Sequence, residues 1–193
     1  MARWIEALRR AELVAAGATL ARRGLIRHGE GNISCRLDSD SFLVTPRGTD
    51  KGRLSAPELV VCTLASVLPA AASSEALLHR ETYRLLPDVF AIVHAHPSHV
   101  LALDSRGVLP DLGGLPEGEA LVGKIARVPV LPPGSRDLAE NCARALRRAP
   151  VAVLARHGLV TVGGNLAEAL ARVEAVELLA QLALARRWGG VLT

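Results

Sequence analysis

The sequence predicts an α/β protein in which one mixed, largely antiparallel sheet packs against helices. Half of its 193 residues are apolar, which is enough to build one core in a single domain spanning residues 1–193. Apolar runs of strand length alternate with longer segments of helical periodicity, and several runs follow one another with no helix between them. A purely parallel sheet needs a crossover at each connection, so these adjacent runs favour antiparallel pairing.

The helices and strands follow from the spacing of apolar residues. The expected helices cover residues 3–23, 73–86, 97–106, 135–148 and 166–187. The expected strands cover residues 32–37, 42–45, 89–95, 128–131, 151–155 and 159–162. Gly24 is placed to end the first helix as a C-terminal cap, and Pro87 ends the second because proline cannot continue a helix.

Two segments have less regular patterns. Ser55 and Glu58 have the spacing of a capping box, with Pro57 in the first turn, which favours the start of a helix. Residues 59–64 have the composition of a strand, so both interpretations stay open for this segment. Residues 107–124 are rich in glycine and proline and are predicted to form a long surface loop.

The composition excludes several classes of protein. The formal net charge is +4, but the arginines form scattered short pairs and only 3% of residues are aromatic, whereas nucleic-acid-binding surfaces cluster their charge and add stacking aromatics. No uncharged apolar run reaches membrane-spanning length, and the N-terminal segment lacks the apolar core of a signal peptide. No dinucleotide-binding glycine motif follows a predicted strand. We therefore expect neither nucleic acid nor membrane as a partner.

The cysteines indicate a reducing compartment. Cys35, Cys62 and Cys142 are odd in number, far apart and outside any C-x-x-C motif. Disulfides are rare in the cytosol, where thiols are kept reduced. We therefore expect free thiols in a cytoplasmic protein.

Two histidines at the end of an expected strand form a candidate metal site. His94 and His96 lie in the run Ala-Ile-Val-His-Ala-His-Pro. Strand residues two apart point to the same face, so the two imidazoles can reach one metal ion. A His-x-His pair on a strand also occurs in many proteins without metal, so this pair needs a further ligand to become a site.

A catalytic zinc ion takes three protein ligands and keeps one position open for substrate or water. His157 ends another apolar strand, and Gly158 would let the backbone turn sharply there. His157 is therefore the candidate third ligand, although a lone histidine is more often structural. His99 could compete, but it lies on the short helix expected after the His-x-His strand. His28 and His79 are interpreted as surface or hydrogen-bonding residues.

Ser73, Ser74 and Glu75 open the helix expected over residues 73–86. Hydroxyl groups and free backbone N–H groups at the positive end of a helix dipole form an anion site. A carboxylate beside that site could move a proton on a nearby substrate. The same residues also suit an ordinary helix start, with Ser73 as N-cap and Glu75 as a favourable first-turn charge.

Two loop motifs carry further groups suited to an anion. Gly31 and Asn32 precede the first strand, where glycine permits close backbone approach and asparagine offers both donors and an acceptor. Arg47 and Gly48 lie in a loop with hydroxyl groups and a second cation, Lys51. Ordinary turn chemistry explains both motifs as well.

Taken in order, these motifs resemble those of the class II aldolase and adducin family. The matching runs are Gly31-Asn32-Ile33-Ser34, Thr45-Pro46-Arg47-Gly48, Ser73-Ser74-Glu75, His94-Ala95-His96-Pro97 and Arg156-His157-Gly158. The resemblance extends from the first expected helix to the last. Each motif is weak alone, but all of them in register are specific. The resemblance implies a three-layer α/β/α fold around the central sheet.

The resemblance also implies a site and a reaction. The implied zinc ligands are His94, His96 and His157, and the implied acid/base is Glu75. The implied phosphate-binding residues are Gly31, Asn32, Gly48, Ser73 and Ser74, with Arg47 beside them. The implied reaction is cleavage of a ketose 1-phosphate, similar to L-fuculose 1-phosphate, to dihydroxyacetone phosphate and an aldehyde. The implied assembly is a homotetramer with sites at subunit interfaces.

The chain departs from the family pattern at two places. Arg47 stands where such aldolases usually carry a small hydroxyl residue, so it could strengthen phosphate binding or mark a carboxylate substrate. The resemblance implies that sugar-phosphate aldolases of this family also use tyrosines for the second proton transfer, on the aldehyde half of the substrate. This chain has one tyrosine, Tyr83, which is expected to be packed within the helix after Glu75. The second proton donor is therefore missing or replaced.

Two alternatives share the predicted fold. A methylthioribulose-1-phosphate dehydratase would use the same zinc and phosphate site to remove water, and the loop from Gly48 to Gly52 has some similarity to that group. A non-catalytic adducin-like module that only binds zinc or a sugar phosphate is the second alternative. Such a scaffold has no need to keep the three histidines and Glu75 together, and this sequence has all of them.

Overall fold

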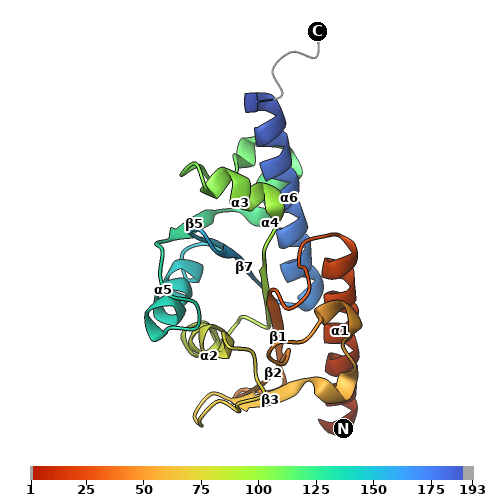
Figure 1. The fold of residues 1–193 in the computed structure, drawn as a ribbon. Helices are drawn as coiled ribbons and strands as arrows, with labels where there is room; N and C mark the ends of the chain where they lie inside the picture. Colours follow the sequence, from red (N-terminus) through yellow and green to blue (C-terminus); the bar gives the residue numbers. More distant parts are fainter. Residues whose placement is uncertain (1, 189–193) are drawn as a thin grey trace.

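A seven-stranded sheet forms the centre of the molecule (Figure 1). The computed structural model describes residues 2–188. The strands are β1 (Asn32–Arg36), β2 (Ser41–Val44), β3 (Val60–Thr63), β4 (Ala91–Ala95), β5 (Ile125–Val128), β6 (Val151–Leu154) and β7 (Gly158–Gly163). They lie in the order β3-β2-β1-β4-β7-β6-β5, and every neighbouring pair is antiparallel except β5 and β6. The predicted mixed, largely antiparallel sheet is confirmed.

Helices cover both faces of this sheet and complete the three layers (Figure 1). They are α1 (Ala2–Arg22), α2 (Ala76–Leu85), α3 (Ser98–Asp104), α4 (Pro116–Val122), α5 (Arg136–Leu146) and α6 (Leu166–Trp188). Helices α2 and α5 pack together on one face, whereas α1 and α6 lie on the other, with α3 and α4 against α6. Each face has its own cluster of buried apolar side chains.

Strand β4, in the middle of the sheet, sends alternate side chains to the two cores. Val93 belongs to the core on the α1 and α6 side, and Ile92 belongs to the core on the α2 and α5 side. Because successive strand residues point to opposite faces, His94 emerges on the same face as Ile92. The register of β4 with β1 also pairs His94 with Asn32. The end of β4 therefore brings a histidine toward α2.

Several local predictions hold at residue level. Helix α1 is closed by Gly24 at φ +68°, with the N–H groups of Gly24 and Leu25 donating back to its last turn at 3.0 and 2.9 Å. The ambiguous segment contains both expected features. Ser55 and Glu58 form a capping box around one short 3-10 turn (Ala56–Glu58), with the Ser55 N–H donating to Glu58 Oε2 at 2.7 Å, and β3 follows directly.

Other predicted boundaries were wrong. The loop expected over residues 107–124 contains a 3-10 turn (Leu112–Gly114) and helix α4. The strand expected over residues 128–131 lies earlier in the chain, as β5 (Ile125–Val128). It ends before Pro129, because proline has no N–H group to continue the ladder of hydrogen bonds. Helix α2 begins at Ala76, not at residue 73.

No helix of the part that the structure describes is long and apolar enough to cross a membrane.

The three cysteines are free and buried, which yields a first testable prediction. Burial raises the pKa of the Cys35 thiol to about 12 and that of Cys62 to about 11, and it raises the pKa of Cys142 still further above its ordinary value. The thiolate is the reactive form, so the native protein should react very slowly with a disulfide reagent at pH 8. Addition of denaturant should release all three thiols; rapid reaction without denaturant would contradict the burial.

Candidate metal and acid–base site

Three histidines meet at the end of the sheet's central strands. His94 is in β4, His96 follows that strand, and His157 lies in the turn between β6 and β7. The Nε2 atoms of His94 and His96 are 3.1 Å apart. The ring centroids of the three residues are 4.8, 4.9 and 5.4 Å from one another, and one ligand atom from each lies within 4.8 Å of the others. The structure therefore brings the three predicted ligands together.

The turn that carries His157 has an unfavourable backbone conformation at Arg156 and a close contact between chain segments at Gly158. Arg156 has a left-handed backbone with φ +60°, although it is not glycine. Its N–H donates to Asp104 Oδ2 at 2.6 Å, and the other oxygen of Asp104 accepts from Arg127 at 2.7 Å. Gly158 does not supply the sharp turn that the sequence suggested. It is needed for close approach, because a Cβ there would lie 2.6 Å from the carbonyl oxygen of Ala95.

Asp104 should therefore stabilise the turn that carries His157. Asp104 is 3% exposed, and its carboxylate accepts a hydrogen bond from the N–H of Arg156, the residue with the left-handed backbone. Replacing Asp104 by alanine leaves that N–H and the Arg127 guanidinium without their acceptor, which should lower the free energy of unfolding by about 2–4 kcal/mol. Urea unfolding measures the change, with exposed Asp88→Ala as the matched control. Equal free energies of unfolding for the two variants would show that the hydrogen bonds of Asp104 to Arg156 and Arg127, together called the Asp104 clamp, do not stabilise the fold.

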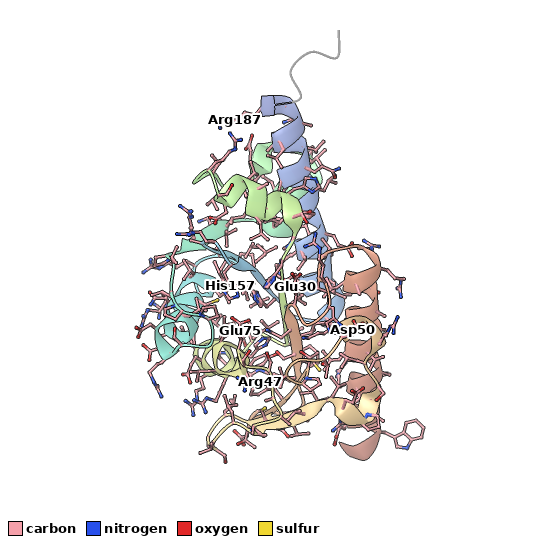
Figure 2. All side chains as sticks on the ribbon, in the orientation of Figure 1. Glu30, Arg47, Asp50, Glu75, His157 and Arg187 are labelled. Carbon is pink, nitrogen blue, oxygen red and sulfur yellow. The ribbon has the colours of Figure 1, made fainter. Side chains whose placement is uncertain are left out.

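The carboxylate of Glu75 lies against two of the imidazoles. Its Oε2 is 3.1 Å from His94 Nε2, and its Oε1 is 3.4 Å from His157 Nε2. Figure 2 shows Glu75 and His157 close to each other at the centre of the molecule. Burial alone raises the pKa of Glu75, but the imidazoles of His94 and His157 and the amide of Asn32 outweigh it, so the pKa lies well below its ordinary value.

This donor set fits a divalent cation. The Nδ1 atom of His94 donates to the carbonyl oxygen of Leu159 at 3.0 Å, so Nε2 is the ring nitrogen that faces the site and could bind a metal ion. Burial, with His94 and His157, lowers the pKa of His96 to about 3, which keeps that ring neutral. Glu75 Oε1 and His157 Nδ1 are buried without a hydrogen-bond partner, as expected of atoms that await a ligand.

The segments of the predicted phosphate site also lie side by side. The N–H of Ser73 donates to the carbonyl oxygen of Thr45 at 3.1 Å, and the N–H of Arg47 donates to that of Ala71 at 3.0 Å. The N–H of Ile33 donates to Thr45 Oγ1 at 3.2 Å. The loops that carry Gly31 and Asn32, Arg47 and Gly48, and Ser73 and Ser74 therefore meet beside Glu75.

Within these loops, individual residues differ from expectation. Glu75 has a non-helical backbone and stands just before α2, not in its first turn. Asn32 is 3% exposed and donates from Nδ2 to Glu75 Oε2 at 3.0 Å, so its amide supports the carboxylate. Ser74 and Arg47 are exposed, whereas Ser73 is at the limit of burial. Gly31 is needed at φ +63°, where a Cβ would lie only 2.5 Å from the carbonyl oxygen of His94.

Two polar residues near the site are more deeply buried than the sequence indicated. His79, interpreted as a surface or hydrogen-bonding residue, is completely buried and hydrogen-bonded, so the second interpretation holds; its position four residues after Glu75 was the available signal that it lies near the site. Lys51 is 3% exposed, with Nζ donating to the carbonyl oxygen of Gly29 at 3.0 Å. His99 faces away as expected, and its Nδ1 is 2.7 Å from Glu177.

The fold and the site together define a class of protein, a three-layer α/β domain in which three histidines that could hold a metal ion lie beside one buried carboxylate. The family model of the Class II Aldolase and Adducin N-terminal domain matches residues 11–184. The chain belongs to this family. Its members include enzymes with aldolase, decarboxylase and dehydratase activities, and the family is generally metal-dependent.

Relatives in the family differ in the reaction that they catalyse. A 3-oxo-tetronate 4-phosphate decarboxylase of Haemophilus influenzae is 34% identical over 176 residues, covering 88% of this chain and 84% of the relative. A methylthioribulose-1-phosphate dehydratase of Bradyrhizobium is 33% identical over 186 residues, covering 86% of each chain. The crystal structure of L-fuculose-1-phosphate aldolase from Thermus thermophilus matches with a TM-score of 0.87 and 30% identity, over 95% of this chain and 96% of that one.

Proposed function

We propose that this chain is a zinc-dependent lyase that removes carbon dioxide from a phosphorylated 3-oxo acid of the 3-oxo-tetronate 4-phosphate type. The product would be dihydroxyacetone phosphate. The similarity to a decarboxylase over most of both chains supports the substrate class. The residues around Glu75 support the reaction type, because they provide one acid–base group beside a three-histidine site.

The proposed reaction needs few protein groups. The bond between the carboxylate carbon and C2 breaks, the electron pair stays on C2 beside the C3 carbonyl, and carbon dioxide leaves without exchanging a proton. Zinc held by His94, His96 and His157 would supply Lewis-acid stabilisation of the negative charge that develops on the carbonyl oxygen. Because Glu75 rests ionised, it first takes up a proton from solvent and then delivers that proton to C2. The phosphate, held by the loops around Gly48 and Ser73, fixes the orientation of the substrate.

The state of Tyr83 is the observation that favours decarboxylation. Cleavage of a ketose 1-phosphate also leaves an electron pair on a carbon of dihydroxyacetone phosphate, but a base must first remove a hydroxyl proton from the departing half. Tyr83 is the one tyrosine of the sequence; it is 1% exposed, with its hydroxyl 2.7 Å from Ser34 Oγ. It therefore cannot reach a substrate in this chain or in an identical partner. Loss of carbon dioxide needs no such base.

Arg47 supports the same choice. It is an exposed cation on the loop that carries Gly48, beside the segment of Ser73. A 3-oxo acid phosphate has a carboxylate in addition to its phosphate, and a guanidinium is well suited to bind it in a bidentate manner. Aldol cleavage of an L-fuculose 1-phosphate-like ketose is the second candidate, favoured by the structural match at TM-score 0.87.

The proposal includes assembly into a homotetramer with sites at subunit interfaces and action in the cytoplasm. Exposed apolar side chains on the first turns of α1 support association, since Trp4 is 84% exposed and Leu8 is 56% exposed. Free buried thiols at Cys35, Cys62 and Cys142 agree with a reducing compartment.

The deciding experiment offers three substrates separately to the zinc-loaded protein. They are 3-oxo-tetronate 4-phosphate, L-fuculose 1-phosphate and methylthioribulose 1-phosphate. Carbon dioxide and dihydroxyacetone phosphate in equal amounts from the first would support the proposal. Release of dihydroxyacetone phosphate and an aldehyde from the second, with no reaction of the first, would replace it by the aldolase. A dehydrated product from the third alone would identify a dehydratase.

A further inference from the structure

Behind Glu75, a chain of buried polar side chains runs away from the site between strand β1 and helix α2. Asn32 Nδ2 is 3.0 Å from Glu75 Oε2, and Asn32 Oδ1 is 2.5 Å from His79 Nε2. His79 Nδ1 is 2.6 Å from Ser34 Oγ, which lies 2.7 Å from the Tyr83 hydroxyl. His79 and Ser34 are 0% exposed, and Tyr83 is 1% exposed. The hydrogen bonds among His79, Ser34 and Tyr83 are therefore shielded from bulk water.

The donor and the acceptor of each hydrogen bond in this chain can be assigned in turn, starting from the carboxylate of Glu75. An ionised Glu75 only accepts, so Asn32 must turn its NH2 group toward it and its oxygen toward His79. The histidine must then donate from Nε2, and its neutral ring is left with an acceptor at Nδ1. Burial lowers the pKa of His79 to about 3, which agrees with a neutral ring. Ser34 therefore donates to Nδ1 and accepts from Tyr83 at 2.7 Å, a shorter contact than the 3.3 Å from the same hydroxyl to the carbonyl oxygen of Phe90.

We propose that His79 is a positioning residue, which with Ser34 and Tyr83 behind it holds the Asn32 amide in the one orientation that donates to Glu75. This inference rests on the acid–base role proposed for Glu75. The bond to Oε2 leaves Oε1 as the oxygen without a hydrogen-bond partner, directed into the site. The side-chain hydrogen bonds of His79 go to Asn32 and Ser34 and not to the three histidines of the site, so it acts through Asn32.

A matched pair of substitutions separates this role from simple packing. In His79→Gln, the amide nitrogen can stand where Nε2 stood and still donate to Asn32. In His79→Asn, the shorter side chain keeps a polar group near Ser34 but cannot reach Asn32. Exposed His28→Asn is the control for the chemical change alone, since its side chain is 81% exposed.

The assay is the exchange of a carbon-bound proton of dihydroxyacetone phosphate with D2O, followed by NMR. It tests proton transfer by Glu75 without any departing group. We expect kcat for exchange to fall about 10–100-fold in His79→Asn, by the size usual for outer-shell partners, with KM and zinc content little changed. His79→Gln should stay within a few-fold of wild type. Equal rates in wild type and His79→Asn, or an equal loss in both variants, would overturn the proposal.

Two further measurements keep the proposal testable if His79→Asn does not fold or if the wild type does not exchange. Ser34→Ala removes the donor to Nδ1 with little change in volume, and it should lower the exchange rate in the same direction. In labelled protein without substrate, the side-chain NH2 of Asn32 should exchange slowly with solvent in wild type and faster in Ser34→Ala. Unchanged protection would contradict the positioning role. An inactive wild type with the expected protection would count against the proposed function alone.

Discussion

Replacement of Glu75 by glutamine should lower kcat by about 10²–10⁴-fold, the range usual for a general acid–base group. Glutamine has nearly the same shape, and its oxygen can still accept from Asn32 Nδ2, which lies 3.0 Å from the carboxylate. It cannot deliver a proton to carbon. Steady-state kinetics on the substrate proposed above, together with elemental analysis of zinc, measure the change. The zinc content should remain about one ion per chain, because the three imidazoles are unchanged.

The control for this variant is Glu140→Gln, since the Glu140 side chain is 41% exposed on α5. Its activity should equal that of the wild type. If Glu75→Gln turned over at the wild-type rate, another group would have to move the proton. If Glu75→Gln lost zinc as well as activity, the carboxylate would be a required ligand rather than the acid–base group.

Replacement of His157 by alanine should remove the metal and, with it, nearly all activity. Two imidazoles, 3.1 Å apart at their Nε2 atoms, would remain, whereas catalytic zinc sites use three protein ligands. Zinc per chain should fall from about one to near zero after dialysis against a weak chelator. The wild type should keep its zinc under the same conditions and lose it, together with turnover, only to a strong chelator.

His99→Ala is the matched control, because His99 pairs with Glu177 and lies outside the site. It should bind zinc as the wild type does. Retention of one zinc ion per chain by His157→Ala would remove this residue from the ligand set. The other two histidines and Glu75 would then have to form the site by themselves.

Much of the fold and part of the site were predictable from local patterns. The period of two along β4 placed His94 and His96 on one face, and the structure confirms it with ring centroids 4.8 Å apart. The terminator at Gly24 and the capping box at Ser55 were predicted for the same reason, since each depends on residues within one helical turn. Only the order of several weak motifs made the family assignment possible.

Other features were decided by contacts between distant segments. The approach of His157 to the other histidines depends on a clamp from Asp104, 52 residues earlier in the chain than Arg156. The burial of His79 depends on Asn32 and Ser34, which belong to strand β1. Pairing of a polar side chain is a property of three-dimensional packing, because any neighbour with the right donor or acceptor can satisfy it.

The sequence by itself therefore determined most of the helices and strands, although not α4, and it determined which chemical groups are available. The tertiary structure alone decided that the hydroxyl of Tyr83, whose packing was expected, lies against Ser34, that Asn32 donates to the carboxylate, and that Oε1 of Glu75 has no hydrogen-bond partner. The physical reason is the distance along the chain over which each kind of interaction acts. Backbone periodicity and capping act over a few neighbouring residues, whereas desolvation and hydrogen-bond pairing depend on whatever the whole fold places within about 3 Å.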